Sequence, residues 1–172
     1  MATIEIKTAD QLIALDPRKQ GARRAGRPTA LLRQILGAFM DRGGPIPVKE
    51  IVAASAEYPA DLTYEALVAL DRDDLIRVRG GGVDIAYPFC ATQMNFTVRL
   101  PAGQERYACC AIGALGIASM LGRPVAIRSR CHQCDEPLEL SAGQQGLESD
   151  AGGVMLWIGR RGEARGKMID SL

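Results

Sequence analysis

Five cysteines carry most of the chemistry that this sequence could perform. Cys109 and Cys110 are adjacent, Cys131 and Cys134 form a Cys-x-x-Cys motif, and Cys90 stands apart. A thiolate is a nucleophile and a ligand for soft metal ions, so each position is a candidate metal ligand. The chain has a single histidine, which excludes a metal site built on several histidines.

Each cysteine also has an ordinary structural interpretation. A buried cysteine is most often a small hydrophobic residue, and this interpretation suits Cys109. The Cys-x-x-Cys motif is half of a tetrahedral zinc site. The other two sulfurs would come from two of the three cysteines Cys90, Cys109 and Cys110. A thioredoxin-type redox role is disfavoured, because that role needs the motif at the start of a helix and a strand is expected here.

The composition is that of a globular protein. The 172 residues are 47% hydrophobic and 24% charged, and 21 basic residues against 20 acidic ones leave a net charge of +1. This excludes a disordered chain and gives no overall attraction to nucleic acid or to an anionic membrane. The longest apolar stretch, residues 108–121, is too short to span a bilayer, and no targeting segment is recognised. We therefore expect a cytoplasmic protein with reduced thiols.

Hydrophobic spacing divides the chain into three expected parts. Residues 1–29 are an N-terminal segment, with a short helix up to Pro17 and then a basic linker. Residues 30–87 form a winged-helix-like module, and residues 88–172 form a small mixed domain with a buried helix against a sheet. The predicted fold class is α+β.

The winged-helix-like module is predicted from three helices followed by a hairpin. Apolar residues at helical spacing mark helices within 31–39, 48–54 and 61–70, with Asp61 as the N-cap of the third. A hairpin follows around the glycines 80–82. The third helix, which would read DNA in such a module, carries five acidic residues and one arginine between 61 and 74. Phosphates would repel it, so nucleic-acid binding is disfavoured.

The second domain is predicted to bring the cysteines together with a helix and a sheet. The spacing predicts a helix over 107–121, so that Cys109 and Cys110 lie near a helix start, where the helix dipole favours a thiolate. Strands are expected at 96–100, at 125–127 leading into the Cys-x-x-Cys turn, at 138–140, and at 154–158. The charged end, residues 159–172, is expected to be frayed.

Several segments resemble the organomercurial (alkylmercury) lyase family. They are Arg106-Tyr-Ala-Cys-Cys-Ala-Ile-Gly-Ala-Leu-Gly-Ile, then Met120-Leu-Gly-Arg-Pro-Val and Ile127-Arg-Ser-Arg-Cys, and more weakly Ala86-Tyr-Pro-Phe-Cys-Ala. The resemblance covers roughly residues 30–158 and is most specific between 106 and 131. It implies a winged-helix-like N-terminal part that does not read DNA, followed by a lyase domain.

The resemblance also implies a reaction. Family members cleave a carbon–mercury bond by protonolysis: two thiolates capture the soft metal, and a carboxylate three residues after the first cysteine helps to deliver the proton. Cys110 corresponds to the nucleophilic cysteine, and Cys131 to a second, mainly structural cysteine. The carboxylate position is Gly113, and no cysteine follows Cys134 where the family has its other catalytic thiol. The chain is therefore a divergent member by this resemblance.

The candidate site follows from these matches. Cys110 is the candidate catalytic residue, Asp135 and Glu136 are candidate replacement acids, and the candidate metal ligands are Cys110, Cys131, Cys134, Cys109 and Cys90. The expected function is binding of mercury or an organomercurial through thiolates, with protonolysis possible. No cofactor is required, although bound zinc or mercury is possible.

Two alternatives remain open at this stage. The first is a non-catalytic protein of the same fold that binds zinc, copper or mercury. The second is a winged-helix regulator that senses a metal. The expected partner in the main interpretation is a small organomercurial or a soft metal ion, and neither nucleic acid nor a membrane.

Overall fold

The computed structural model describes residues 28–55, 59–149, 151–156 and 169. Its helices are α3 (Thr29–Arg42), α4 (Val48–Ala54), α5 (Ala60–Arg72) and α6 (Ala111–Leu121). Its strands are β1 (Ile46–Pro47), β2 (Ile76–Arg79), β3 (Gly82–Ala86), β4 (Phe89–Cys90), β5 (Phe96–Arg99), β6 (Glu105–Ala108), β7 (Val125–Arg130), β8 (Pro137–Gly143) and β9 (Gly146–Leu147).

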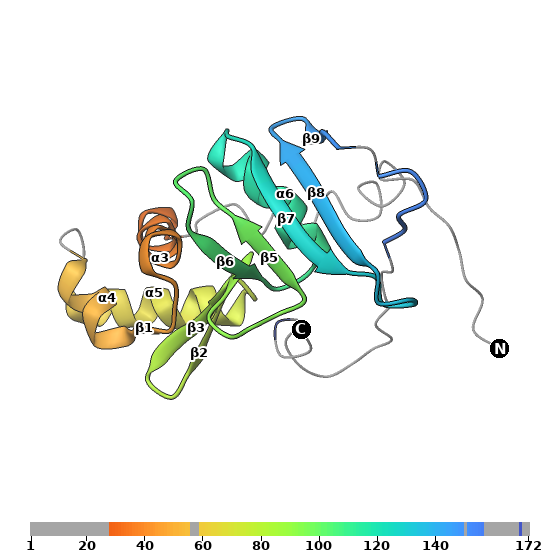
Figure 1. Cartoon of the computed structure of the whole chain (residues 1–172). Helices are drawn as coiled ribbons and strands as arrows, with labels where there is room; N and C mark the ends of the chain where they lie inside the picture. The colour runs from red at the N-terminus through yellow and green to blue at the C-terminus, as the bar shows by residue number, and fades with distance from the viewer. Residues whose placement is uncertain (1–27, 56–58, 150, 157–168, 170–172) are drawn as a thin grey trace.

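The described strands form one antiparallel sheet that runs through the molecule. Its order is β1-β3-β4-β6-β5-β7-β8-β9, and β2 pairs with β3 off this path. Helices α3, α4 and α5 gather at the β1–β3 end, whereas α6 lies against the strands β5, β7 and β8 (Figure 1). The expected mixed class of helices and sheet is confirmed. The sheet continues across residue 87, where the expected boundary between the second and third parts lies.

The elements between residues 29 and 86 follow the hydrophobic spacing. Leu31, Ile35 and Phe39 on α3 are fully buried and pack with residues of α5 and the hairpin. The hairpin of β2 and β3 turns at Gly80 and Gly81, both at positive φ, which glycine adopts without steric cost. The expected N-cap was wrong, because α5 begins at Ala60 after Pro59 and no side chain caps its first turn.

Arg106 on β6 joins α3 to the sheet. Its guanidinium donates hydrogen bonds to the backbone oxygens of Phe39, at 2.7 Å, and Asp41, at 2.7 Å. These carbonyls belong to the last turn of α3, where the helix dipole favours a positive charge, and the Phe39 oxygen also accepts the Gly43 N–H. The strand that leads to the cysteine pair is thereby fixed against α3.

The helix expected over 107–121 begins later than predicted. Residues 105–108 form β6, which pairs with β4 on one side and β5 on the other, and α6 begins at Ala111. Backbone pairing with two neighbours outweighs the helical preference of Tyr107 and Ala108. The α6 residues Ala114, Ile117 and Ala118 are buried against the sheet.

The C-terminal expectations need two corrections. Residues 154–156 are not a strand: Val154 donates to the oxygen of Ala151 in a turn, and β9, at 146–147, pairs with β8 instead. Ile169 is buried beside Ile85, which contradicts fraying at that residue. The expected helix before Pro17, the linker up to residue 27, Ile158 and the rest of the charged end lie outside the described residues.

No helix in the described ranges is long and apolar enough to cross a membrane.

Candidate functional site

Cys110 lies where β6 has ended and α6 begins. It is the N-cap of α6, with an extended backbone, and its Sγ accepts a hydrogen bond from the Gly113 backbone N–H at 3.4 Å. Side-chain oxygens usually occupy this position, and here a sulfur faces the unpaired N–H groups and the positive end of the helix dipole. Its side chain is only partly buried. Cys110 is thus a reachable sulfur in a setting that favours negative charge.

Tyr87 is the hydroxyl partner of this sulfur. Its Oη lies 3.8 Å from the Cys110 Sγ. Burial raises the pKa of Tyr87, and a negative charge on Cys110 raises it further, so the hydroxyl keeps its proton across the working pH range. Sequence reasoning did not single out Tyr87. Its only signal was its place in the Tyr-Pro-Phe segment.

Gly113 is buried beside both groups and leaves little room for a side chain. A Cβ placed on Gly113 would lie 3.6 Å from the Cys110 Sγ and 3.6 Å from the Tyr87 Cζ, with the Pro88 Cβ at 3.1 Å. The residue three positions after Cys110 therefore faces the thiol, as expected for the first turn of a helix. A carboxylate at 113 would reach the sulfur, but glycine has no group to offer.

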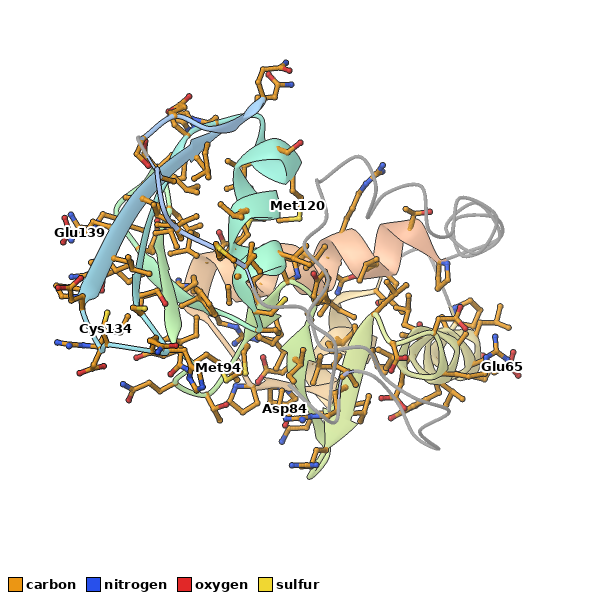
Figure 2. All side chains as sticks on the ribbon, turned by 90° about the vertical axis from the view of Figure 1, so that its right-hand side faces the viewer. Glu65, Asp84, Met94, Met120, Cys134 and Glu139 are labelled. Carbon is orange, nitrogen blue, oxygen red and sulfur yellow. The ribbon has the colours of Figure 1, made fainter. Side chains whose placement is uncertain are left out.

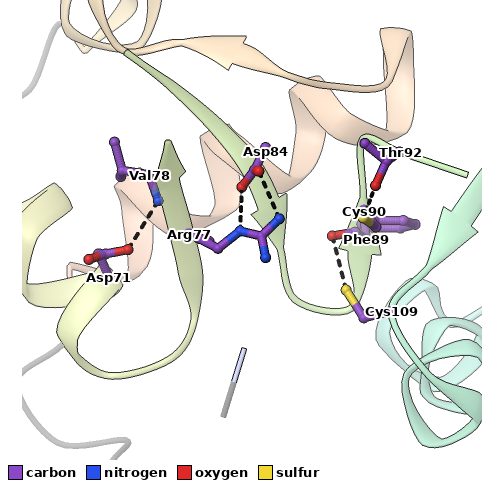
Figure 3. Close-up of polar contacts among 8 residues, drawn as sticks. All are labelled: Asp71, Arg77, Val78, Asp84, Phe89, Cys90, Thr92 and Cys109. Carbon is purple, nitrogen blue, oxygen red and sulfur yellow. Dashed lines mark hydrogen bonds and ion pairs between the residues drawn. The ribbon is translucent and has the colours of Figure 1, made fainter. Parts of the chain in front are cut away.

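Cys90 and Cys109 form a separate, buried thiol pair on β4 and just after β6. The Cys109 Sγ donates to the Phe89 oxygen at 3.4 Å, and the Cys90 Sγ lies 3.2 Å from the Thr92 hydroxyl (Figure 3). A hydrogen bond from Cys109, helped by Thr92 and the charge of Arg77, lowers the pKa of Cys90 to about 6. The same hydrogen bond, with burial, raises the pKa of Cys109. The pKa values of the two thiols are therefore shifted in opposite directions.

Arg77 is held near this pair by an ion pair. Its guanidinium donates to both carboxylate oxygens of Asp84, at 2.9 and 2.8 Å, across the β2–β3 hairpin (Figure 3). Both side chains are largely buried, so this two-point contact fixes the orientation of the arginine.

Cys131 and Cys134 lie together on the turn between β7 and β8, as the sequence predicted. Figure 2 shows Cys134 on the side of the molecule opposite to Glu65 of α5. Hydrogen bonds from the backbone N–H groups of Cys134 and Gln133, and from the Cys134 thiol, lower the pKa of Cys131. The Cys134 sulfur accepts the backbone N–H of Glu136, but its hydrogen bond to Cys131 and its slight burial raise its pKa overall.

The candidate acids Asp135 and Glu136 lie on this turn, away from the start of α6. Arg130 pairs with the Asp135 carboxylate at 3.0 Å and donates to its backbone oxygen at 2.7 Å. Asp135 has a positive φ of 57°, which a short polar side chain tolerates. Among the described side chains, no hydrogen bond or ion pair joins either carboxylate to Cys110.

The five sulfurs therefore occupy three places. Cys110 lies at the helix start, Cys90 and Cys109 lie in the interior, and Cys131 and Cys134 lie on the turn. Within residues 28–55, 59–149, 151–156 and 169, no three histidine, cysteine or acidic side chains come together as a metal-binding group. The four-sulfur zinc site considered from the sequence is not formed by this part of the chain.

Known proteins resemble the chain over its second half and in its fold. The family model for alkylmercury lyase matches residues 89–171. An alkylmercury lyase of Streptomyces lividans is 32% identical over 106 residues, covering 60% of this chain and 46% of the relative. One from Staphylococcus epidermidis is 28% identical over 113 residues, covering 64% and 49%. The chain thus spans about half the length of these relatives.

A solved structure shares the fold. The crystal structure of the mercury-bound form of MerB2 superposes with a TM-score of 0.61 at 20% identity, covering 84% of this chain and 65% of that one.

Proposed function

Residues 89–171 belong to the alkylmercury lyase family, and on that premise we propose that the chain binds organomercurials through the thiolate of Cys110 and cleaves the carbon–mercury bond. The observation that carries the proposal is the Cys110 sulfur at the start of α6, where it accepts the Gly113 N–H and meets the Tyr87 hydroxyl. Other proteins of the family are described as alkylmercury lyases.

Binding uses the affinity of mercury for sulfur. The Cys110 thiolate attacks the mercury of an R–Hg–X compound, a sulfur–mercury bond forms, and X leaves with its electron pair. The sulfur lies at the positive end of the helix dipole and accepts the Gly113 N–H. The partly buried sulfur admits a small substrate, and Tyr87 and Pro88 line its side next to Gly113.

Cleavage needs a proton for the leaving carbon. We propose that the Tyr87 hydroxyl gives it, because this donor contacts the Cys110 sulfur while position 113 has no carboxylate. The proton forms the new carbon–hydrogen bond with the electron pair of the carbon–mercury bond, and Hg(II) stays on Cys110. A thiol from the medium then returns a proton to the Tyr87 oxygen and takes the second mercury position as a thiolate. Since a phenol is a weak acid, this route is slow compared with one through a carboxylic acid.

The N-terminal helices have a structural role in this proposal. We propose that residues 30–87 are a winged-helix-like module packed on a lyase-like domain of residues 88–172. The hydrogen bonds from Arg106 to the end of α3 support this arrangement, as does the sheet shared by the two parts. The acidic residues of α5 argue against a DNA-reading role. The need for reduced thiols favours a cytoplasmic location.

The test is a challenge of reduced protein with phenylmercury in excess thiol, with benzene measured by gas chromatography and bound mercury by mass spectrometry. Cys110→Ser is expected to lose organomercurial binding and benzene release. Tyr87→Phe is expected to keep binding and to release benzene about 10²-fold more slowly, as expected for the loss of a general acid of low strength. Undiminished binding by Cys110→Ser would overturn the proposal. Unchanged benzene release by Tyr87→Phe would mean that Tyr87 is not the proton donor.

A further inference from the structure

We propose that the turn carrying Cys131 and Cys134 is a second thiolate site, which chelates inorganic Hg(II) and not the organomercurial. The inference rests on the proposed function for the source of the ion, since Hg(II) is the product of carbon–mercury cleavage. Its geometry stands apart from the Cys110 site.

The turn already holds two sulfurs close enough to share one ion. Cys131 and Cys134 lie three positions apart on the tight turn that joins the ends of β7 and β8, and neither side chain is buried. Two backbone hydrogen bonds close the turn: Cys131 N–H to the Glu136 oxygen at 2.8 Å, and Asp135 N–H to the Cys131 oxygen at 2.9 Å. The backbone therefore presents the sulfur pair before any ion arrives.

The number of ligands selects the ion. Among the described residues no third histidine, cysteine or carboxylate joins the pair in a metal-binding group. Structural zinc takes four protein ligands, so this turn alone does not satisfy it. Hg(II) is soft and forms stable complexes with two thiolates. In R–Hg⁺ the carbon already occupies one of the two linear positions, so one thiolate completes the coordination.

Access also favours this turn over the buried sulfur pair. Cys134 is exposed and Cys131 is partly exposed, whereas Cys90 and Cys109 are 6% and 5% exposed. An ion can reach the turn without opening the core, but it would have to displace packed side chains to reach the buried pair. The two pairs are therefore distinguishable by experiment.

The strand register brings the turn to the same end of the sheet as Cys110. Strand β5 pairs with β6 at Phe96–Ala108 and with β7 at Thr97–Arg128, so the ends of β6 and β7 lie on either side of it. The ends of β6 and β7 are therefore two strand spacings apart, which is about 10 Å. Hg(II) released near Cys110 would therefore meet a high local concentration of the sulfur pair.

Transfer to the turn is a thiolate exchange with no net oxidation. A bond from mercury to Cys131 forms as the bond to Cys110 breaks, and Cys110 leaves as a thiolate. The thiol of Cys134 then replaces the remaining outside thiolate and passes its proton to it. Mercury stays divalent throughout, and Cys110 is free for another substrate molecule.

The test measures retention of Hg(II) and identifies the sulfurs that hold it. Reduced full-length chain, Cys110→Ser, Cys131→Ser/Cys134→Ser and the triple variant receive one equivalent of mercuric chloride with excess glutathione. After desalting, metal mass spectrometry counts the mercury. Iodoacetamide labelling and peptide mapping then show which thiols are protected. The Cys110→Ser chain is expected to retain one Hg(II) and to protect Cys131 and Cys134, and the triple variant to lose that ion.

Three outcomes would overturn the inference. One is protection of Cys90 and Cys109 in place of the turn, and another is undiminished retention by the triple variant. The third comes from zinc chloride in place of mercury: one zinc retained for every two chains, dependent on the turn, would make the pair half of a site between two copies. Because the Cys110→Ser chain binds Hg(II) without cleaving anything, failure of benzene release leaves this result intact.

Discussion

Two sulfur sites at one end of the sheet differ in what surrounds them. Cys110 is a single thiol at a helix start, beside the Tyr87 hydroxyl and the backbone of Gly113. The turn has two thiols, with the carboxylates of Asp135 and Glu136 directly after them, but no helix behind it. In our proposal the first environment presents one sulfur for attack. The second offers two sulfurs for chelation, and its carboxylates lie where they do not serve Cys110.

The difference teaches that sequence distance is a poor guide to which acid assists which thiol. Asp135 lies one residue after a cysteine, but its carboxylate pairs with Arg130. Tyr87 lies 23 residues before Cys110, and its hydroxyl contacts the sulfur. Short antiparallel strands make this possible, because β4 returns next to β6 and brings the segment before it to the start of α6.

The largest expected effect comes from restoring an acid at the Cys110 site. Gly113→Asp places a carboxyl group beside the sulfur, and we expect benzene release from phenylmercury to rise, by as much as about 10²–10⁴-fold if the acid acts as a general acid. The substitution must accommodate the Pro88 Cβ, which would lie 3.1 Å from the new Cβ. Gas chromatography under single-turnover conditions measures the rate.

Gly113→Asn is the matched control, because it has nearly the same shape and cannot donate as a carboxylic acid. An equal rise with Asn would assign the gain to packing. No rise with Asp, in a folded chain, would mean that the site has diverged too far for the family's acid to work.

The next largest effect, on the free energy of unfolding, is expected where α3 meets β6. Arg106→Ala removes two hydrogen bonds to the carbonyls of Phe39 and Asp41. Urea unfolding should show a loss of about 1–3 kcal/mol. Arg106→Lys should recover only part of it, since an ammonium group cannot make the same forked contact. Unchanged stability of the alanine variant would mean that these hydrogen bonds to α3 do not support the Cys110 site.

The buried pair predicts a dependence of stability on pH. Cys90 has a pKa of about 6 in the folded chain and an ordinary value of 9.0, so between these values the unfolded chain binds more protons. Stability should therefore rise as the pH increases through this window and fall away as the pH drops toward 6, by at most about 1.4 kcal/mol per pH unit. Above the ordinary value the sign reverses, because folded Cys109 keeps its proton.

Urea unfolding at several pH values measures this profile. Cys90→Ala should remove most of its slope, while Cys134→Ser, which removes only a smaller contribution through Cys131 on the turn, should leave most of the slope in place. A profile that is the same in all three chains would mean that the interior pair does not titrate on folding.

The smallest effect is expected on the turn. Cys131→Ser/Cys134→Ser should change thermal stability by no more than about 0.5 kcal/mol in metal-free protein, since the side chains are partly or fully exposed and backbone bonds hold the turn. Calorimetry after treatment with a chelator tests this. A large loss of thermal stability would mean that Cys131 and Cys134 have a structural role, and the contrast between the turn and the Cys110 site would then be weaker.

Much of this molecule could be predicted from its sequence because the relevant signals are local. Hydrophobic spacing predicted α3, α4 and the β2–β3 hairpin, and alternation predicted the hairpin that carries Cys131 and Cys134. The family resemblance around residues 106–131 is confirmed by the family match. The sequence alone also determined that position 113 lacks a carboxylate and that no cysteine follows Cys134.

Only the tertiary structure decided which groups meet. Residues 107 and 108 are strand because β4 and β5 pair on either side of them, and this moves Cys110 from inside a helix to its N-cap. The five cysteines separate into three places because β4, the start of α6 and the β7–β8 turn lie at different depths in the fold. Contacts such as that of Tyr87 depend on strand order and register, which residue spacing does not encode.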